Sequence, residues 1–189
     1  HNGQVKQIVG GSLLDAGDYA KENFVSDKDG GYYASLYKNN NLKGGHIILL
    51  NPTTSEYYEA DVTQAKKALA SYPQGLMLGG GINNENATRF LEYGASHVIV
   101  TSFVFKNGEI RFDNLDKIVS ETGKEHLVLD LSCRKKEDGY YIVTDRWQKF
   151  TNVKVTPQLM NELSSYCDEY LIHAVDVEGK AHGIESDLV

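Results

Sequence analysis

The chain has 189 residues, of which 26 are acidic and 19 basic, so its net charge is −7. With 41% hydrophobic and 24% charged residues, its composition is that of a globular protein and excludes a disordered chain. The length accommodates one domain or two small ones. The acidic balance provides no basic surface for nucleic acid or for an anionic membrane, and we expect neither as a partner.

The cysteines and the start of the chain bear on the compartment. Cys133 and Cys167 are too few for a disulfide framework and fit a reducing compartment, and we expect Cys133 to be a buried structural residue. No apolar run approaches the ~20 residues that span a bilayer. The segment His1–Gln4 is polar and has neither a Met nor a secretory apolar region. We therefore expect a cytoplasmic protein whose chain has been cut.

Short apolar runs bounded by turn-forming residues recur along the sequence. Most are β-branched or Leu-rich without strict alternation, which is typical of parallel strands buried on both faces. A further strand is expected over Tyr140–Val143, after a turn at 137–139. The recurring runs are Val5–Val9, His46–Leu50, Leu76–Leu78, His97–Val100, His126–Leu131 and Tyr170–Ala174.

Helical spacing of apolar residues separates these runs near 62–69, 84–93, 115–119 and 159–166. Thr156-Pro157 predicts the start of the last of these helices, with an N-cap and a proline at the first helical position. Strands that alternate with helices indicate βαβ units. At roughly 31 residues per unit, the chain holds about six units of a (β/α)₈ barrel. An open doubly wound sheet also accommodates six strands, and composition does not separate the two folds.

In both architectures the active site lies at the carboxyl ends of the strands, where this sequence places polar residues. Gly80 and Gly81 follow one strand and precede a helix, an arrangement whose backbone N–H groups suit a phosphate. Thr101 and Ser102 follow the next strand and can supply hydroxyl donors to the same anion. The structural alternatives are a tight turn with positive φ for the glycines and strand-end caps for the hydroxyls.

Asp130 lies in an otherwise apolar strand and shares one face with Ser132 by strand parity. A carboxylate in such a position can have a raised pKa and act as an acid or a base; the alternative is a structural Asp bonded to a neighbouring loop. Trp147 either stacks on a planar ligand or packs in the core. His173 lies near the carboxyl end of its strand. The other strand-associated histidines, His46, His97 and His126, open their strands at the opposite end, so we expect no metal cluster from them.

Six segments together resemble one family: 1–11, 79–83, 95–102, 129–135, 144–148 and 173–179. They closely resemble the phosphoribosylformimino-5-aminoimidazole carboxamide ribotide isomerase of histidine biosynthesis, in the branch found in plants, fungi and some bacteria. The resemblance runs from His1 to Val189. It implies a (β/α)₈ barrel, a doubly phosphorylated substrate and an Amadori rearrangement of an aminoaldose to an aminoketose. It also implies that neither a metal nor an organic cofactor takes part, and we expect a monomer.

The resemblance also implies roles for particular residues. The reaction needs an acid that opens the ribose ring and a base that removes the C2′ proton, and two carboxylates suit this pair of tasks. Asp130 carries over as one catalytic carboxylate. Alignment on Gly179 places Glu178 at the position of a second, with Asp176 two residues earlier. The residues implied to bind substrate are Gly80, Gly81, Thr101, Ser102, Arg146, Trp147 and His173.

The expected domain is a single barrel over 1–189 that lacks the start of its first strand and the last two βα units. In the family, the first strand carries an Asp that would lie two residues before His1. Two alternatives stay open on the sequence. One is the related histidine-pathway barrel, the imidazole glycerol phosphate synthase cyclase subunit, which would need an ammonia partner. The other is a barrel fragment that binds a phosphorylated ligand without turnover.

Overall fold

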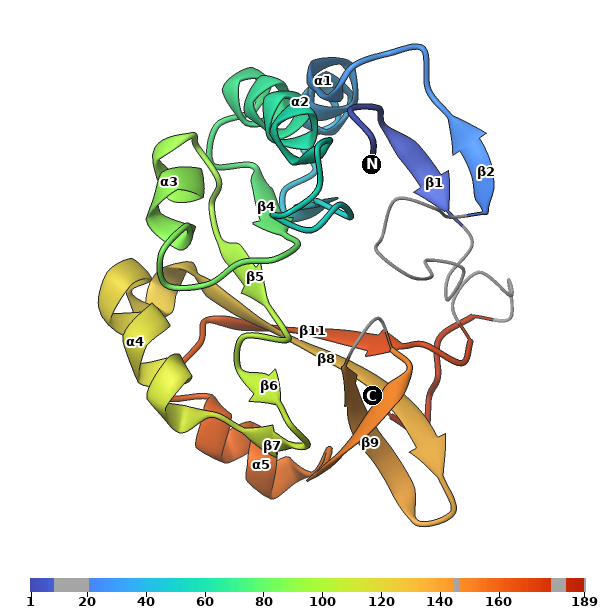
Figure 1. Ribbon diagram of the computed structural model, residues 1–189, viewed down its shortest axis with the longest axis vertical. Coiled ribbons are helices and arrows are strands. Elements are labelled where there is room, and N and C mark those ends of the chain that lie inside the picture. The colour runs from blue at the N-terminus through green and yellow to red at the C-terminus, as the bar shows by residue number, and fades with distance from the viewer. Residues whose placement is uncertain (9–20, 145–146, 178–182, 189) are drawn as a thin grey trace. The chain divides into compact units, whose positions relative to one another are not determined.

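Strands and helices alternate along much of the chain (Figure 1). The structure is a computed structural model that describes residues 1–8, 21–144, 147–177 and 183–188. It divides into two units, His1–Ile99 and Val100–Val189, and each is described by itself. None of the helices in the described ranges is both long enough and apolar enough to cross a membrane.

The first unit is built on three parallel strands. β3 pairs in parallel with β4, from Gly45 opposite Leu76 to Ile48 opposite Gly79, and β4 pairs in parallel with the start of β5. All four residues of β4 are buried, and helix α2 packs Val62 and Leu69 into the same core. The elements are β1 (Lys6–Ile8), β2 (Glu22–Val25), α1 (Gly30–Asn39), β3 (Gly45–Ile48), α2 (Tyr58–Ser71), β4 (Leu76–Gly79), α3 (Ala87–Glu92) and β5 (Val98–Val100).

The second unit combines a parallel pair with an antiparallel hairpin. β11 runs parallel to β8, while β9 and β10 extend the sheet from β8 in antiparallel pairs. Leu127, Leu129 and Leu131 of β8 are fully buried. The elements are β6 (Phe105–Lys106), β7 (Glu109–Ile110), α4 (Phe112–Thr122), a short 3₁₀ turn (Lys124–His126), β8 (Leu127–Lys136), β9 (Gly139–Thr144), β10 (Lys149–Lys154), α5 (Pro157–Leu163) and β11 (Glu169–Ala174).

Most of the predicted elements are confirmed. The apolar runs from 46 onward form β3, β4, β5, β8 and β11, and the extra strand predicted after 137–139 is β9. The four predicted helices are α2, α3, α4 and α5. Thr156 is the N-cap of α5, where its side chain accepts a hydrogen bond from the backbone N–H of Leu159 at 3.2 Å. The class is therefore α/β, while closure into a barrel stays a prediction.

The interpretation of Val5–Val9 as a buried parallel strand is wrong for the residues that the structure describes. Lys6–Ile8 forms β1, which pairs antiparallel with β2, and the burial of β1 is only partial. Val9 lies outside the described residues. Both faces of this two-stranded ribbon are at least partly exposed, which explains why its short apolar run does not indicate a core strand.

Candidate active site

The register between β8 and β11 places two predicted site residues, Asp130 and His173, on one face of the sheet. The two strands are parallel, and His173 lies directly opposite Ser132, while Leu171 lies opposite Asp130. Directly opposed residues in a sheet project from the same face, so His173 shares a face with Ser132. Asp130 and Ser132 are two residues apart on β8 and also share this face, as strand parity predicts.

Asp130 is held by two hydroxyl groups. Thr101 Oγ1 donates to Asp130 Oδ2 at 2.8 Å, and Ser132 Oγ donates to Asp130 Oδ1 at 2.8 Å. Burial raises the pKa of the Asp130 carboxyl. The bonds from both hydroxyls and the charge on His173 act in the opposite direction, because they favour the charged carboxylate. Asp130 is therefore a carboxyl of raised pKa in a fixed orientation, which suits proton transfer.

Ser132 connects this carboxyl to two rings. Its Oγ lies 3.0 Å from His173 Nδ1, and it accepts a hydrogen bond from Trp147 Nε1 at 3.2 Å. The rings of Trp147 and His173 meet edge to face with their centroids 5.3 Å apart. Trp147 also has a φ of 68°, a left-handed backbone conformation that is rare for a bulky residue and often occurs at functional sites. Trp147 is thus part of the polar site, not of an apolar core.

Asp176 lies just beyond β11 and is engaged by two groups of β8. Arg134 Nε donates to Asp176 Oδ1 at 2.8 Å, and the backbone N–H of Lys135 donates to Asp176 Oδ2 at 3.2 Å. Arg134 is two residues beyond Ser132 and therefore lies on the same face of β8. Two other predicted site residues, Glu178 and Arg146, lie outside the described residues.

The glycine loop belongs to the first unit. Gly80 has a φ of 100° and Gly81 a φ of 66°. A Cβ on Gly80 would lie 2.1 Å from the carbonyl oxygen of Leu49, whereas a Cβ on Gly81 would meet only Thr53 Cγ2 at 3.8 Å. The turn reading of the sequence is thus confirmed at both glycines, and the close approach to Leu49 adds a second requirement at Gly80. Phosphate binding by this loop stays a prediction.

The two hydroxyl residues predicted beside the glycine loop, Thr101 and Ser102, have different environments. Thr101 donates its only hydroxyl proton to Asp130, and its backbone carbonyl accepts from Val104 and Phe105. Ser102 is exposed. Thr101 belongs to the second unit and the two glycines to the first. A phosphate site formed by the glycines together with the two hydroxyls therefore stays a prediction. Thr101 is brought together with Asp130 instead, a contact that the sequence did not indicate.

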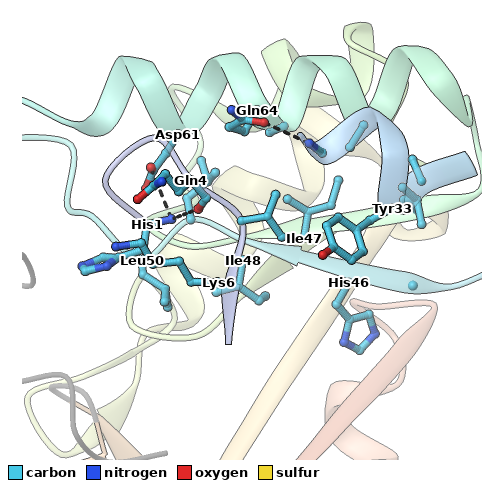
Figure 2. A pocket seen from close by; sticks show the side chains of 18 of the residues that line it. His1, Gln4, Lys6, Tyr33, His46, Ile47, Ile48, Leu50, Asp61 and Gln64 are labelled. Atoms are coloured by element: carbon cyan, nitrogen blue, oxygen red, sulfur yellow. Dashed lines mark hydrogen bonds and ion pairs between the residues drawn. The ribbon is translucent and has the colours of Figure 1, made fainter. Parts of the chain in front are cut away.

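A pocket of about 200 Å³ lies in the first unit, between β1, β3, α1 and α2 (Figure 2). Its walls include Tyr33, His46 and Ile47, and Asp61 and Gln64 line it from α2. None of the predicted site residues that the structure describes lines this pocket.

The cysteines and acidic residues form no further chemical centre in the described part of the chain. Within those ranges, no group of three or more His, Cys, Asp or Glu is arranged to hold a metal ion. Cys133 is buried, and burial together with nearby carboxylates raises the pKa of its thiol to about 12. The prediction of a buried structural cysteine is therefore confirmed.

Two contributors to the site were not predicted as site residues. Ser132 is fully buried and contacts Asp130, His173 and Trp147, and Arg134 binds Asp176. Strand parity alone places both on the face of Asp130, so the signal was present in the alternation 130, 132, 134. Strand parity does not identify the residues on the neighbouring strand. The partners of these side chains therefore could not be predicted, because they depend on the register of β8 with β11.

Comparison with known proteins gives a consistent family. The model of the family described as "Histidine biosynthesis protein" matches residues 1–189. The chain is 51% identical, over 193 aligned positions, to the chloroplastic 1-(5-phosphoribosyl)-5-((5-phosphoribosylamino)methylideneamino)imidazole-4-carboxamide isomerase of Medicago truncatula. It is 45% identical to the isomerase of the same name from Yarrowia lipolytica and 44% identical to that from Saccharomyces cerevisiae. The whole chain aligns in each case, but it spans only 60% of the plant protein and 70% of each fungal one.

Proposed function

Because the chain belongs to the histidine biosynthesis protein family, we propose that the full-length protein is its aldose–ketose isomerase. The reaction is the Amadori rearrangement of the phosphoribosylformimino aminoaldose of aminoimidazole carboxamide ribotide to the phosphoribulosyl aminoketose. The observation that carries the proposal is the buried carboxyl of Asp130 on β8, which hydrogen bonds from Thr101 and Ser132 hold in one orientation. The relatives described above carry isomerase names, which supports this reading over the cyclase.

Asp130 acts on the ribose ring of the substrate. Burial raises its pKa and so favours the protonated carboxyl, which can donate its proton to the ring oxygen as the ring opens to an imine. A second carboxylate then removes the C2′ proton, and the resulting enolamine tautomerises to the ketone. Both tasks are proton transfers that side chains of this protein carry out, and we propose that they need neither a metal nor an organic cofactor.

The second carboxylate comes from the segment after β11, where Asp176 and Glu178 are the candidates. Asp176 is bound by Arg134 and by the backbone N–H of Lys135, so its carboxylate is held in a fixed orientation. A charge-assisted bond to an Arg suits a positioned carboxylate. We propose that Asp176 or Glu178 faces the substrate opposite Asp130.

The remaining predicted site residues bind the substrate. We propose that Gly80 and Gly81 bind a phosphate through backbone N–H groups and that Ser102 donates its hydroxyl to a phosphate, while the Thr101 hydroxyl stays bonded to Asp130. Trp147 stacks on the planar part of the substrate, because its indole lies beside Asp130 through the bond to Ser132. We propose that Arg146 and His173 contribute further polar contacts to the substrate.

The complete protein is proposed to be a single (β/α)₈ barrel that is monomeric and binds neither nucleic acid nor membrane. The region 1–189 supplies about six of the eight βα units, and the flanking sequence supplies the start of the first strand and the last two units. The name of the Medicago relative places that protein in the chloroplast. For this protein the proposed compartment is the cytoplasm.

The test is a direct assay of the full-length protein with the aminoaldose substrate. We expect conversion to the aminoketose, followed by proton NMR, at the same rate with and without a chelator. An Asp130→Asn variant serves as the matched control and should show little conversion. A well-folded protein that leaves the aminoaldose unchanged would overturn the proposal. Consumption of the aminoketose only when ammonia is added would instead identify the cyclase.

A further inference from the structure

The hydroxyl of Ser132 has three polar partners but only one proton to donate, so it must accept hydrogen bonds as well. Ser132 has no exposed surface, and its Oγ lies within hydrogen-bond distance of Asp130, His173 and Trp147. The distances are 2.8 Å to Asp130 Oδ1, 3.0 Å to His173 Nδ1 and 3.2 Å to Trp147 Nε1. A serine hydroxyl has one proton to donate and two lone pairs to accept with, so the three contacts fill its capacity.

The chemistry of the three partners fixes the direction of each bond. The indole N–H of Trp147 is only a donor, so Ser132 accepts from it. An ionised Asp130 is only an acceptor, so Ser132 gives its proton to that carboxylate. The remaining lone pair of Ser132 faces His173 Nδ1, which must therefore carry a proton. A neutral His173 then has Nε2 as its acceptor nitrogen.

We propose that Ser132 is a positioning residue for the proposed isomerase reaction. Its single hydroxyl orients the Asp130 carboxyl, anchors the Trp147 indole and selects the Nδ1–H tautomer of His173. This inference rests on the proposed function for the reaction that it serves, while the assignment of the hydrogen bonds rests on the geometry alone. Ser132 is not expected to touch the substrate, because it is fully buried behind the groups that it holds.

The position also explains why a serine is suited to this task. Ser132 lies between Asp130 on its own strand and His173 directly across on β11, so one short side chain reaches both. An alanine at 132 would leave the Trp147 N–H and the His173 Nδ1–H without this acceptor, and would remove one of the two hydroxyl donors of Asp130. A threonine would keep the hydroxyl, and a β-branched residue is favoured on a strand.

The first experiment measures the tautomer of His173 by nitrogen NMR on histidine-labelled full-length protein, at about pH 8, above the usual His pKa. The carboxyl carbon shift of Asp130 in the same sample verifies that this group is ionised. We expect the proton of the neutral His173 on Nδ1 in the wild-type protein. A proton on Nε2 with an ionised Asp130 would overturn the proposal, and this measurement needs neither a variant nor isomerase activity.

The second experiment compares variants by steady-state kinetics and thermal melts. Ser132→Ala should lower kcat by about 10-fold to 10²-fold, since small displacements of a catalytic group cost rates on that scale. KM should rise less, and Ser132→Thr should recover most of kcat. Thr122→Ala is the matched control, because Thr122 is a buried hydroxyl of the same unit whose partners among the described residues are the backbone carbonyls of Ile118 and Gly123, outside the site. It should lose stability without loss of kcat.

The outcomes separate the two proposals. A wild-type protein with no isomerase activity removes the reaction, and with it the positioning role, even if His173 carries its proton on Nδ1. An active wild-type protein in which Ser132→Ala loses only stability, as Thr122→Ala does, overturns the positioning role and leaves the function intact. If Ser132→Ala does not fold, the wild-type NMR measurement and the Ser132→Thr kinetics still decide.

Discussion

Thr101 donates its hydroxyl proton to Asp130 across 2.8 Å, although the two residues are 29 positions apart in the chain. The sequence suggests separate tasks for them, phosphate binding for Thr101 and proton transfer for Asp130. The bond links Thr101 to the chemistry of Asp130. Burial disfavours the charged form of the Asp130 carboxyl, and the bond from Thr101 stabilises that form. Thr101 therefore helps to determine how readily Asp130 gives up and regains a proton.

Replacement of Asp130 by Asn should separate a catalytic role from a structural one. Asn keeps the size of the side chain, and its amide oxygen can replace one of the two carboxylate oxygens as a hydrogen-bond acceptor, so the full-length variant should fold. It cannot transfer a proton, and general acid–base catalysis contributes about 10²–10⁴-fold, so kcat should fall on that scale. Kinetics and a thermal melt measured together check this. A variant that melts normally and keeps its kcat would remove Asp130 from the mechanism.

The same variant should reveal the buried charge through the pH dependence of stability. The pKa of Asp130 is raised in the folded protein above the value of ~3.9 that is usual for an unfolded chain. The folded state therefore binds the proton more tightly, and this contribution is complete at low pH and is lost as pH rises through the folded pKa. As pH rises from about 4 through the folded pKa of Asp130, Asp130→Asn should thus gain stability relative to the wild-type protein. Urea unfolding at several pH values measures the difference, and a flat or falling difference would contradict it.

The strands and most helices were predictable because their signals are local. Leu127, Leu129 and Leu131 are buried in β8, and an apolar run of this kind needs no knowledge of the rest of the fold. Helix α1 gives no such signal. Its buried residues are Gly30 and Ala34, while its larger apolar side chains lie mainly toward solvent. A helix that packs through small residues lacks the apolar stripe on which sequence patterns depend.

The site was predictable to the level of a strand face, and not to the level of contacts. Strand parity groups Asp130 with Ser132, and the position of His173 at a strand end marks it as a site candidate. The bond between Ser132 and His173 depends on the register of β8 with β11, which a 41-residue separation does not encode locally. The bond between Thr101 and Asp130 likewise depends on how a strand-end residue approaches a neighbouring strand.

Both cysteines should resist alkylation in the folded protein. Cys133 and Cys167 are buried, and desolvation raises the pKa of each thiol, to about 12 for Cys133. At about pH 8 the reactive thiolate form should be scarce as well as shielded. Peptide mapping after treatment with iodoacetamide should find both residues unmodified until guanidinium is added. Ser120→Cys, at an exposed position of α4, provides a reactive control, and native labelling of Cys133 at the rate of that control would contradict the prediction.

Gly80 and Gly81 differ in why each position requires glycine. Both have a positive φ, but only Gly80 also lies close to the backbone of Leu49. A Cβ at Gly80 would lie 2.1 Å from the oxygen and 2.7 Å from the nitrogen of Leu49. Leu49 cannot easily give way, because its N–H donates to the carbonyl of Gly79 at 2.9 Å. At Gly81 the nearest heavy atom would be 3.8 Å away, so only the positive φ opposes a side chain there.

Gly80→Ala should therefore lower the free energy of unfolding of the full-length protein by about 3 kcal/mol or more, the range of steric strain that a core does not absorb. Gly81→Ala should cost only about 1–2 kcal/mol, the penalty of a left-handed conformation for an L side chain. Urea unfolding of the two variants beside the wild-type protein measures both losses. Two small and equal losses would mean that the loop can move away from Leu49, and a larger loss for Gly81→Ala would reverse the assignment of the two glycines.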